Sequence, residues 1–542
     1  MTTVFAARRI ITMNPRRPHA THVAVRDGRI LGAGTLEELA GWGDHALDER
    51  FAGKVLMPGF VEGHAHAMEG TLWRHVYCGW FDRTDPEGRR WEGLRSLDAV
   101  LARLSEAAGR LAPGAPLFGF QLDPIYMGNV TVTRAELDRV STDRPIGVLH
   151  ASGHIMNVNS AALEAAGLLR KGIEHPGIPL GQDGLPLGPL RGPDAYMPVG
   201  PHVGFERSLL DADEAGLRDF AKLCVRTGTT TVTDLAARLD DEDVEMMLRV
   251  TAEADFPVRL VPLKFALGMT PAELIERVRH LAALSTDALR LGRIKVVADG
   301  SIQGFSARMR WPGYHNGAPN GLWYVAPEQL AEIYERALAA GIQVHTHTNG
   351  DEATELVLDL MGPALTRHPR PDHRFTLQHC QLADRAQFER MRALGMSVNL
   401  FANHHFYWGD EHYRLTVGPE RAERMNAART ALDLGVPLAI HSDAPVTPLG
   451  PLFTAWCAVE RRTASGRVQG AHERIAPAEA LHAITMGAAR TLHLDGEVGS
   501  IETGKRADFA VLEVDPEEAG ALKDVPVWGT VQGGRVFEAP AA

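Results

Sequence analysis

Histidines stand in two closely spaced pairs in this sequence, and each pair closes a run of apolar residues. The first pair is His64 and His66, and the second is His345 and His347. Side chains at positions i and i+2 of a β-strand share one face, so each pair can direct two imidazoles at one point. Neutral imidazole is a common ligand of zinc and similar ions. The spacing therefore indicates a metal site.

Further residues of the ligand type close later apolar runs. His379 ends one run, Asp443 follows His441 at the end of another, and Lys295 stands four residues before Asp299, a carboxylate that could pair with it. A single histidine at a strand end is most often an ordinary hydrogen-bonded residue, and this chain has 24 histidines. The recurrence of such residues at the ends of several strands nevertheless favours a metal centre.

Short apolar segments alternate with amphipathic ones through the middle of the chain, which is the pattern of repeated βα units. The expected strands are residues 55–66, 229–235, 257–265, 293–300, 341–349, 374–381, 396–402 and 437–445. Eight parallel strands predict an α/β fold of the (β/α)8 TIM-barrel type, whose active site lies at the strand C-termini. A doubly wound sheet is the alternative, but no G-x-G-x-x-G follows a strand.

Both ends of the chain have β-rich patterns with hairpin turns at Asp27-Gly28 and Gly533-Gly534. We expect residues 1–57 and 495–542 to form one small composite β-sandwich domain, because chain termini often lie close together. The barrel then occupies 58–494. The long gap after its first strand predicts an inserted lobe at about 70–210, in which the Gly/Pro-rich stretch 171–204 is expected to be a loop.

Composition limits the partners that the chain can have. The net charge is −12, which argues against nucleic acid and against a polybasic membrane contact. No apolar run approaches the roughly 18 residues of a membrane span. Four cysteines without a C-x-x-C pair indicate neither a disulfide framework nor a zinc knuckle. We expect a cytoplasmic homodimer that acts on a small-molecule substrate.

Several blocks of the sequence resemble motifs of a known family. VLMPGFVEGHAHAMEG resembles the first-strand motif of the metal-dependent amidohydrolase superfamily. Successive motifs of its amidohydrolase-3 subgroup, which includes N-substituted formamide deformylase-like enzymes, resemble IKVVADGSIQGFSARM, HTHTNGDEA, LQHCQLAD and HSDAPV. The resemblance covers nearly the whole chain, is specific for the superfamily and says little about the substrate.

The resemblance implies a set of metal ligands. His64 and His66 would bind the more buried ion, and His347 and His379 a second ion. Alignment on the Gly-Asp pair at 350–351 selects His347 over His345, which would lie one layer deeper.

The resemblance also implies that Lys295 is carbamylated and bridges two divalent ions, with zinc the expected metal. A mononuclear site with an unmodified lysine is the alternative. Asp443 would lie beside the bridging water, both as a ligand and as the acid/base that moves protons, whereas His441 would lie deeper.

Other residues are candidates for contact with the substrate. Gln121 lies in the expected lobe, and His154 resembles a position near the pocket of the family. Trp311, Tyr314 and His404 follow the fourth and seventh strands, where loops form the pocket of a barrel. The alternative is that the aromatic rings only pack between the lobe and the barrel.

These expectations favour hydrolysis of an amide, formamide or related C–N bond by a metal-activated hydroxide. A deaminase, lactonase or carbamate hydrolase would use the same metal site. A non-catalytic metal-binding protein is the alternative of another class, and an acid/base carboxylate argues against it. A nicotinamide-dependent oxidoreductase is disfavoured by the missing glycine motif.

Overall fold

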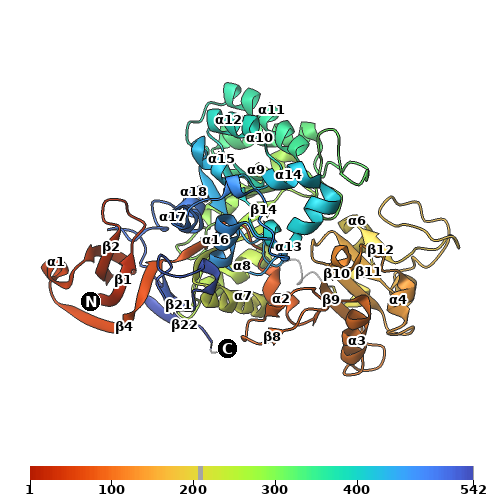
Figure 1. The fold of residues 1–542 in the computed structure, drawn as a ribbon, viewed down its shortest axis with the longest axis horizontal. Coiled ribbons are helices and arrows are strands. Elements are labelled where there is room, and N and C mark those ends of the chain that lie inside the picture. The colour runs from red at the N-terminus through yellow and green to blue at the C-terminus, as the bar shows by residue number, and fades with distance from the viewer. Residues whose placement is uncertain (206–211, 541–542) are drawn as a thin grey trace. The chain divides into compact units, whose positions relative to one another are not determined.

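The computed structural model describes residues 1–205 and 212–540 (Figure 1). The end of the predicted lobe (206–210) and the last two residues of the predicted terminal domain (541–542) lie outside this part. The chain forms two compact units. One contains Met1–His66, Ala221–Ala444 and the chain from Leu449, and the other contains Ala67–Phe220 with Pro445–Pro448. No helix in the described ranges is both long enough and apolar enough to cross a bilayer.

The first unit is built on an eight-stranded parallel sheet. In chain order its strands are β5 (Phe60–Glu62), β13 (Thr229–Ala237), β14 (Arg259–Phe265), β15 (Ile294–Val297), β16 (Val344–Thr348), β17 (Thr376–His379), β18 (Ser397–Leu400) and β19 (Leu438–Ile440). Each strand pairs with the one before it along the chain. This confirms the predicted α/β class with eight parallel strands.

The sheet is curled, and its first and last strands are joined just beyond their C-terminal ends. Ala65 forms a parallel bridge with Ala444. The Asp443 amide donates to the His64 carbonyl at 3.0 Å, and the His66 amide donates to the Ala444 carbonyl at 2.7 Å. These bonds bring the residues that follow β5 next to those that follow β19.

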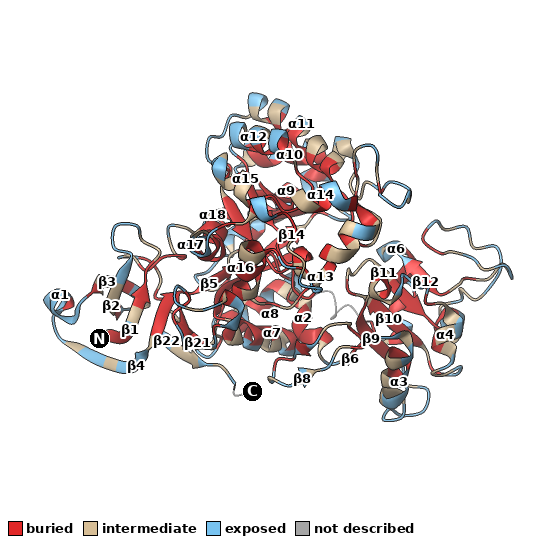
Figure 2. Ribbon diagram, in the orientation of Figure 1, coloured by how far each residue is buried: buried red, intermediate tan, exposed pale blue. Residues whose placement is uncertain are grey.

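Strand alternation decides which side chains face the helices. In β16, Val344 belongs to the apolar core that the strands share with the helices. Thr346 is hydrogen-bonded to Tyr334 of helix α10 (Pro327–Ala340) at 2.6 Å, so it faces the same side. His345 and His347 therefore face the other side, as the period of two requires. Figure 2 shows these strands buried, whereas the helices are exposed along one side.

Helices follow the strands and cover the outer face of the sheet. They include α8 (Asp241–Thr251), α9 (Pro271–Ala283), α10, α11 (Asp351–Arg367), α12 (Arg385–Ala393), α15 (Ala428–Asp433) and α16 (Pro451–Glu460). Helix α9 shows why they begin where they do: Thr270 and Glu273 form a capping box with proline at the first turn. The apolar faces of α9, α10, α11, α12, α15 and α16 bury one continuous core with the strands.

Both ends of the chain share a second sheet in this unit. Its order is β22-β21-β20-β4-β1-β2-β3, with β1 (Thr2–Ile11), β2 (His19–Arg26), β3 (Arg29–Gly34), β4 (His45–Pro58), β20 (Phe509–Leu512), β21 (Val527–Gln532) and β22 (Arg535–Glu538). Strand β4 pairs with β20 in antiparallel register. The strands form one seven-stranded sheet, and the predicted two-sheet sandwich and its boundaries stay a prediction.

The second unit contains a five-stranded sheet in the order β12-β11-β10-β9-β6. The strands are β6 (Val76–Tyr77), β9 (Leu117–Leu122), β10 (Ile146–His150), β11 (Ile155–Val158) and β12 (Pro189–Arg191), and α3 (Leu97–Ala108) packs against β9. The prediction of a loop through 171–204 was wrong in part. This stretch contributes β12 and helix α6 (Pro193–Tyr196), since β12 completes an antiparallel pairing with β11.

Candidate metal centre

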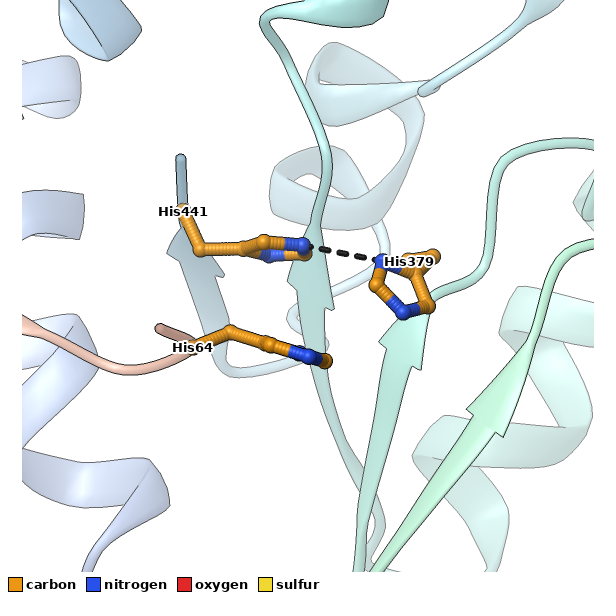
Figure 3. Close-up of side chains that lie close together, drawn as sticks. All are labelled: His64, His379 and His441. Atoms are coloured by element: carbon orange, nitrogen blue, oxygen red, sulfur yellow. Dashed lines mark hydrogen bonds between the residues drawn. The ribbon is translucent and has the colours of Figure 1, made fainter. Parts of the chain in front are cut away.

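Four histidines and an aspartate converge at the C-terminal ends of the parallel strands. The Nε2 atoms of His64 and His66 are each 3.3 Å from Asp443 Oδ1. The Nδ1 of His379 lies 3.9 Å from Asp443 Oδ2 and 3.0 Å from His441 Nε2. Figure 3 shows three of the rings facing one another: His64 just after β5, His379 at the end of β17 and His441 just after β19.

These spacings suit ligands of a shared cation. Two atoms that are each about 2.1 Å from a tetrahedral ion are about 3.4 Å apart. The ligand atoms of His64, His66 and Asp443 lie within 4.8 Å of one another, and so do those of His64, His379 and His441. The buried Asp443 Oδ1 accepts no hydrogen bond within the described ranges. The donor set therefore fits a divalent metal such as zinc.

Burial keeps the central imidazoles neutral, which is the state that binds metal. His64 and His379 are each 2% exposed and His441 is fully buried. Burial, and secondarily the neighbouring cationic groups, lower the pKa of His64 and of His379 well below the ordinary value. Burial lowers the pKa of His441 to about 3. From the sequence, His441 was expected to lie deeper and was given no role as a ligand. In the structure His441 lies within the cluster.

A glutamine sets the orientation of His64. Gln378 Oε1 accepts from His64 Nδ1 at 2.8 Å and from Asn399 Nδ2 at 3.0 Å. Its amide nitrogen lies 2.7 Å from His345 Nδ1. Because the oxygen can only accept, the proton of neutral His64 is on Nδ1, and the Nε2 lone pair faces Asp443. Sequence reasoning missed Gln378, whose role depends on several strands meeting at one point.

Glu62 is a second buried residue that sequence reasoning missed. It accepts from the Ser442 hydroxyl at 2.7 Å and from the Ser442 and His64 amides at 3.2 and 3.1 Å. Burial raises the pKa of Glu62 to about 8, against the opposing effect of these bonds. Glu62 thereby ties the segment that carries His64 to the one that carries Asp443. Its place two residues before His64, inside an apolar run, was the available signal.

Lys295 lies on β15 and is 2% exposed. Its Nζ donates to no acceptor among the residues that the structure describes. Burial lowers the pKa of Lys295 to about 7, and Asp443 partly opposes that shift. Asp299, the carboxylate that an unmodified lysine could have paired with, accepts instead from the amides of Arg308, Asn349 and Gly350, each at 2.9 Å.

The two histidines of β16 have different neighbours. The His347 ring centroid is 4.4 Å from that of His379, and its Nε2 is 3.3 Å from the Gly300 carbonyl. His345 instead contacts Gln378. His347 is therefore the member of the pair that lies beside the cluster.

The predicted substrate-binding residues of the first unit have different surroundings. Trp311 is 94% exposed, so it does not line a buried pocket. The Tyr314 hydroxyl exchanges hydrogen bonds with the amide and carbonyl of Ala307, at 2.9 and 3.1 Å, which occupies it within its own loop. His404 is buried and hydrogen-bonded through Nδ1 to His412 at 2.9 Å.

Two predicted substrate-binding residues belong to the second unit. Gln121 is buried, and its amide nitrogen donates to the Pro445 carbonyl at 2.6 Å. His154 is half-buried, and its carbonyl accepts from the Gly192 amide at 2.9 Å. Both therefore have structural bonds within that unit.

Comparison with known proteins identifies relatives of the whole chain. The sequence profile described as the amidohydrolase family matches residues 52–537. The chain is 27% identical to Protein LONG AFTER FAR-RED 3 of Arabidopsis thaliana, with 97% of this chain and 90% of that protein covered. It is also 27% identical to N-substituted formamide deformylase of Arthrobacter pascens, with 96% and 95% covered.

A solved structure shares the fold. A metal-dependent hydrolase of Pyrococcus horikoshii, described as uncharacterized, superposes with a TM-score of 0.73 at 20% identity. The superposition covers 96% of this chain and 99% of that one.

Proposed function

Because the chain belongs to the amidohydrolase family, we propose that it is a metal-dependent hydrolase that cleaves an amide, formamide or related carbon–nitrogen bond. The observation that carries the proposal is the buried cluster in which two imidazole Nε2 atoms face one carboxylate oxygen at 3.3 Å. The formamide deformylase of Arthrobacter pascens supports the choice of bond.

We propose zinc as the metal, held by His64, His66 and Asp443 on one side and by His347 and His379 on the other. When bound, such an ion polarises a carbonyl group and lowers the pKa of a coordinated water toward about 7. The chain itself supplies the neutral imidazoles and the carboxylate, which lie at the C-terminal ends of the strands. His441 Nε2, 3.0 Å from His379 Nδ1, either orients that ring or is a further ligand.

Lys295 is proposed to be carbamylated. Its neutral amine would attack the carbon of CO2 and release one proton, which yields a carbamate with two ligand oxygens. Burial supports this reaction because it favours the uncharged amine, and no acceptor within the described ranges holds the Nζ. A carbamylated Lys295 would fit a site with two ions, whereas an unmodified Lys295 would fit a site with one ion.

Asp443 is proposed to move the protons of the reaction. Its carboxylate can take a proton from the attacking water and return it to the leaving nitrogen, because an amine leaves poorly until it is protonated. Hydrogen bonds between the His64 and Asp443 segments hold the carboxylate opposite the imidazoles. The geometry thus supports one acid/base group that faces the ligand cluster.

We also propose that the curled sheet is a complete (β/α)8 barrel. The bonds that join the segments after β5 and β19 support closure, as does the shared fold of the Pyrococcus horikoshii hydrolase. The terminal sheet would then be a composite domain outside the barrel.

A panel of amides tests the proposed reaction. Purified protein is incubated with N-butylformamide, N-phenylformamide and N-butylacetamide, together with a lactone and a carbamate, before and after removal of metal. We expect amine release from an amide, loss of that activity with a chelator, and recovery with zinc. Turnover of only the lactone or carbamate contradicts the proposed bond class, and activity that persists without metal contradicts the proposed chemistry.

A further inference from the structure

A line of three buried polar side chains runs beside the metal centre. His404 lies in α13 (His404–Glu411), and His412 and Thr416 lie in the π-helical turn that follows it, His412–Thr416. His404 Nδ1 is 2.9 Å from His412 Nε2, and His412 Nδ1 is 2.7 Å from Thr416 Oγ1. The imidazole planes differ by only 2°. Such π-helical turns are frequent at functional sites.

The direction of these hydrogen bonds follows from the threonine. Thr416 is fully buried, and within the described ranges its hydroxyl has one partner, His412 Nδ1. A buried hydroxyl that donates to nothing is costly, so Thr416 donates and His412 Nδ1 accepts.

The remaining protons can then be placed along the line. Burial lowers the pKa of His412 to about 3 and that of His404 well below its ordinary value, so each ring carries one proton. The His412 proton is therefore on Nε2, from which it donates to His404 Nδ1. The single proton of His404 must be on Nε2.

Within the described ranges the side chain of His404 makes its hydrogen bond through Nδ1, so its Nε2–H has no acceptor there. His404 is nevertheless only 2% exposed. Its ring lies against Phe401, with centroids 4.4 Å apart, and Phe401 also stacks on His441, with centroids 4.9 Å apart. The Nε2 of His404, which makes no hydrogen bond to a described residue, thus lies one ring away from the proposed metal ligands.

We propose that His404 donates its Nε2–H to the carbonyl oxygen of the substrate, and that Thr416, acting through His412, fixes the tautomer that allows this. The inference rests on the proposed function and deepens it. Negative charge grows on that oxygen as hydroxide attacks, so the hydrogen bond is strongest in the transition state. His404 is then a catalytic residue, and His412 and Thr416 are positioning residues.

The tautomer can be measured without any turnover. Protein labelled with ¹⁵N-histidine is examined by long-range ¹⁵N–¹H correlation, with His404→Gln and His412→Gln used to assign the signals. We expect both rings to carry their proton on Nε2, and Thr416→Val to shift His412 toward the Nδ1–H form. A wild-type His404 with its proton on Nδ1 overturns the proposal even if the enzyme hydrolyses amides.

The contact with substrate has its own readouts. Saturating N-butylformamide should move the His404 Nε2–H resonance downfield, and no shift with any amide of the panel overturns the contact. Thr416→Val should lower kcat about ten- to a hundredfold with little change in KM, whereas Thr416→Ser restores it. His405→Gln is the matched control, since His405 is equally buried in the same helix but bonds to Gln469. Equal loss in Thr416→Val and His405→Gln indicates a merely structural role and overturns the proposal.

Discussion

Replacing Lys295 by methionine should change how the stability of the metal-free protein depends on pH. The ammonium is buried and has no hydrogen-bond acceptor within the described ranges. Its pKa falls from 10.5 to about 7 on folding. Methionine has a similar length and no charge, so the variant removes the cost of burying the amine while it fills much of the same space.

The sign and size of the effect follow from the two pKa values. Between pH 7 and 10.5 the unfolded wild type binds more protons than the folded one, so its stability rises with pH. Below pH 7 the burial of the charged Lys295 destabilises the folded wild type to the full extent, and above pH 10.5 this destabilisation is absent. At about 1.4 kcal/mol per pKa unit, the difference of about 3.5 units corresponds to an upper limit of about 5 kcal/mol.

Urea unfolding of metal-stripped protein measures this difference. Buffers free of CO2 keep the lysine amine unmodified. We expect Lys295→Met to be more stable than wild type at pH 7, and the gap to close as pH approaches 10.5. Lys505→Met is the control, because Lys505 is 8% exposed but its Nζ donates to the Asp495 and Val498 carbonyls. A gap for Lys295→Met that does not change with pH would refute the reasoning.

Three further variants probe the centre. Asp443→Asn keeps the shape of the side chain but removes its basicity, so kcat should fall about 10²- to 10⁴-fold, measured by amine release at saturating substrate. Gln378→Leu removes the acceptor that orients His64, so zinc affinity should fall about ten- to a hundredfold in competition with a chromogenic chelator. Glu62→Leu leaves the Ser442 hydroxyl without its acceptor and should lower the melting temperature of metal-free protein, since the loss of a buried partner costs about 1–3 kcal/mol.

Each of these variants has a result that would contradict its premise. Near-wild-type kcat in Asp443→Asn with bound metal retained would show that another group moves the protons. Unchanged zinc affinity in Gln378→Leu would show that the orientation of His64 does not depend on the amide. A Glu62→Leu protein as stable as wild type would remove the role of Glu62 in joining the two segments. Gln329→Leu on helix α10 controls for loss of a glutamine, because the Gln329 amide donates to the Met269 carbonyl at 3.2 Å and contacts none of the histidines of the centre.

Local pattern is enough to predict part of the fold. Runs of apolar residues between amphipathic helices predict the eight parallel strands, because strands buried on both faces are mostly apolar. The period of two likewise predicts that the members of each histidine pair share a face. It could not tell how His345 and His347 differ, since both point the same way. Strand register decides that, by pairing His345 with Thr376 and His347 with Gln378.

Features that depend on several strands were not predictable. Gln378 orients His64 only because β5, β16, β17 and β18 bring their side chains together. Asp299, four residues after Lys295, was a possible carboxylate partner for an unmodified lysine. The loop after β15 instead turns the Asp299 carboxylate onto three backbone amides. The exposed Trp311 and the internally bonded Tyr314 show the same limit, because loop conformation rather than residue type decides whether a ring lines a pocket.

The most direct test of the central claim is the metal content of the wild type and of the His64→Ala/His66→Ala variant. Both proteins are stripped, reloaded with zinc, passed through a desalting column and analysed for metal per chain. The account predicts that the wild type retains zinc and that the double variant loses at least one ion per chain, whereas His280→Ala, at an exposed position of α9, retains the wild-type amount. Equal zinc content in the double variant and the wild type would contradict the proposed centre.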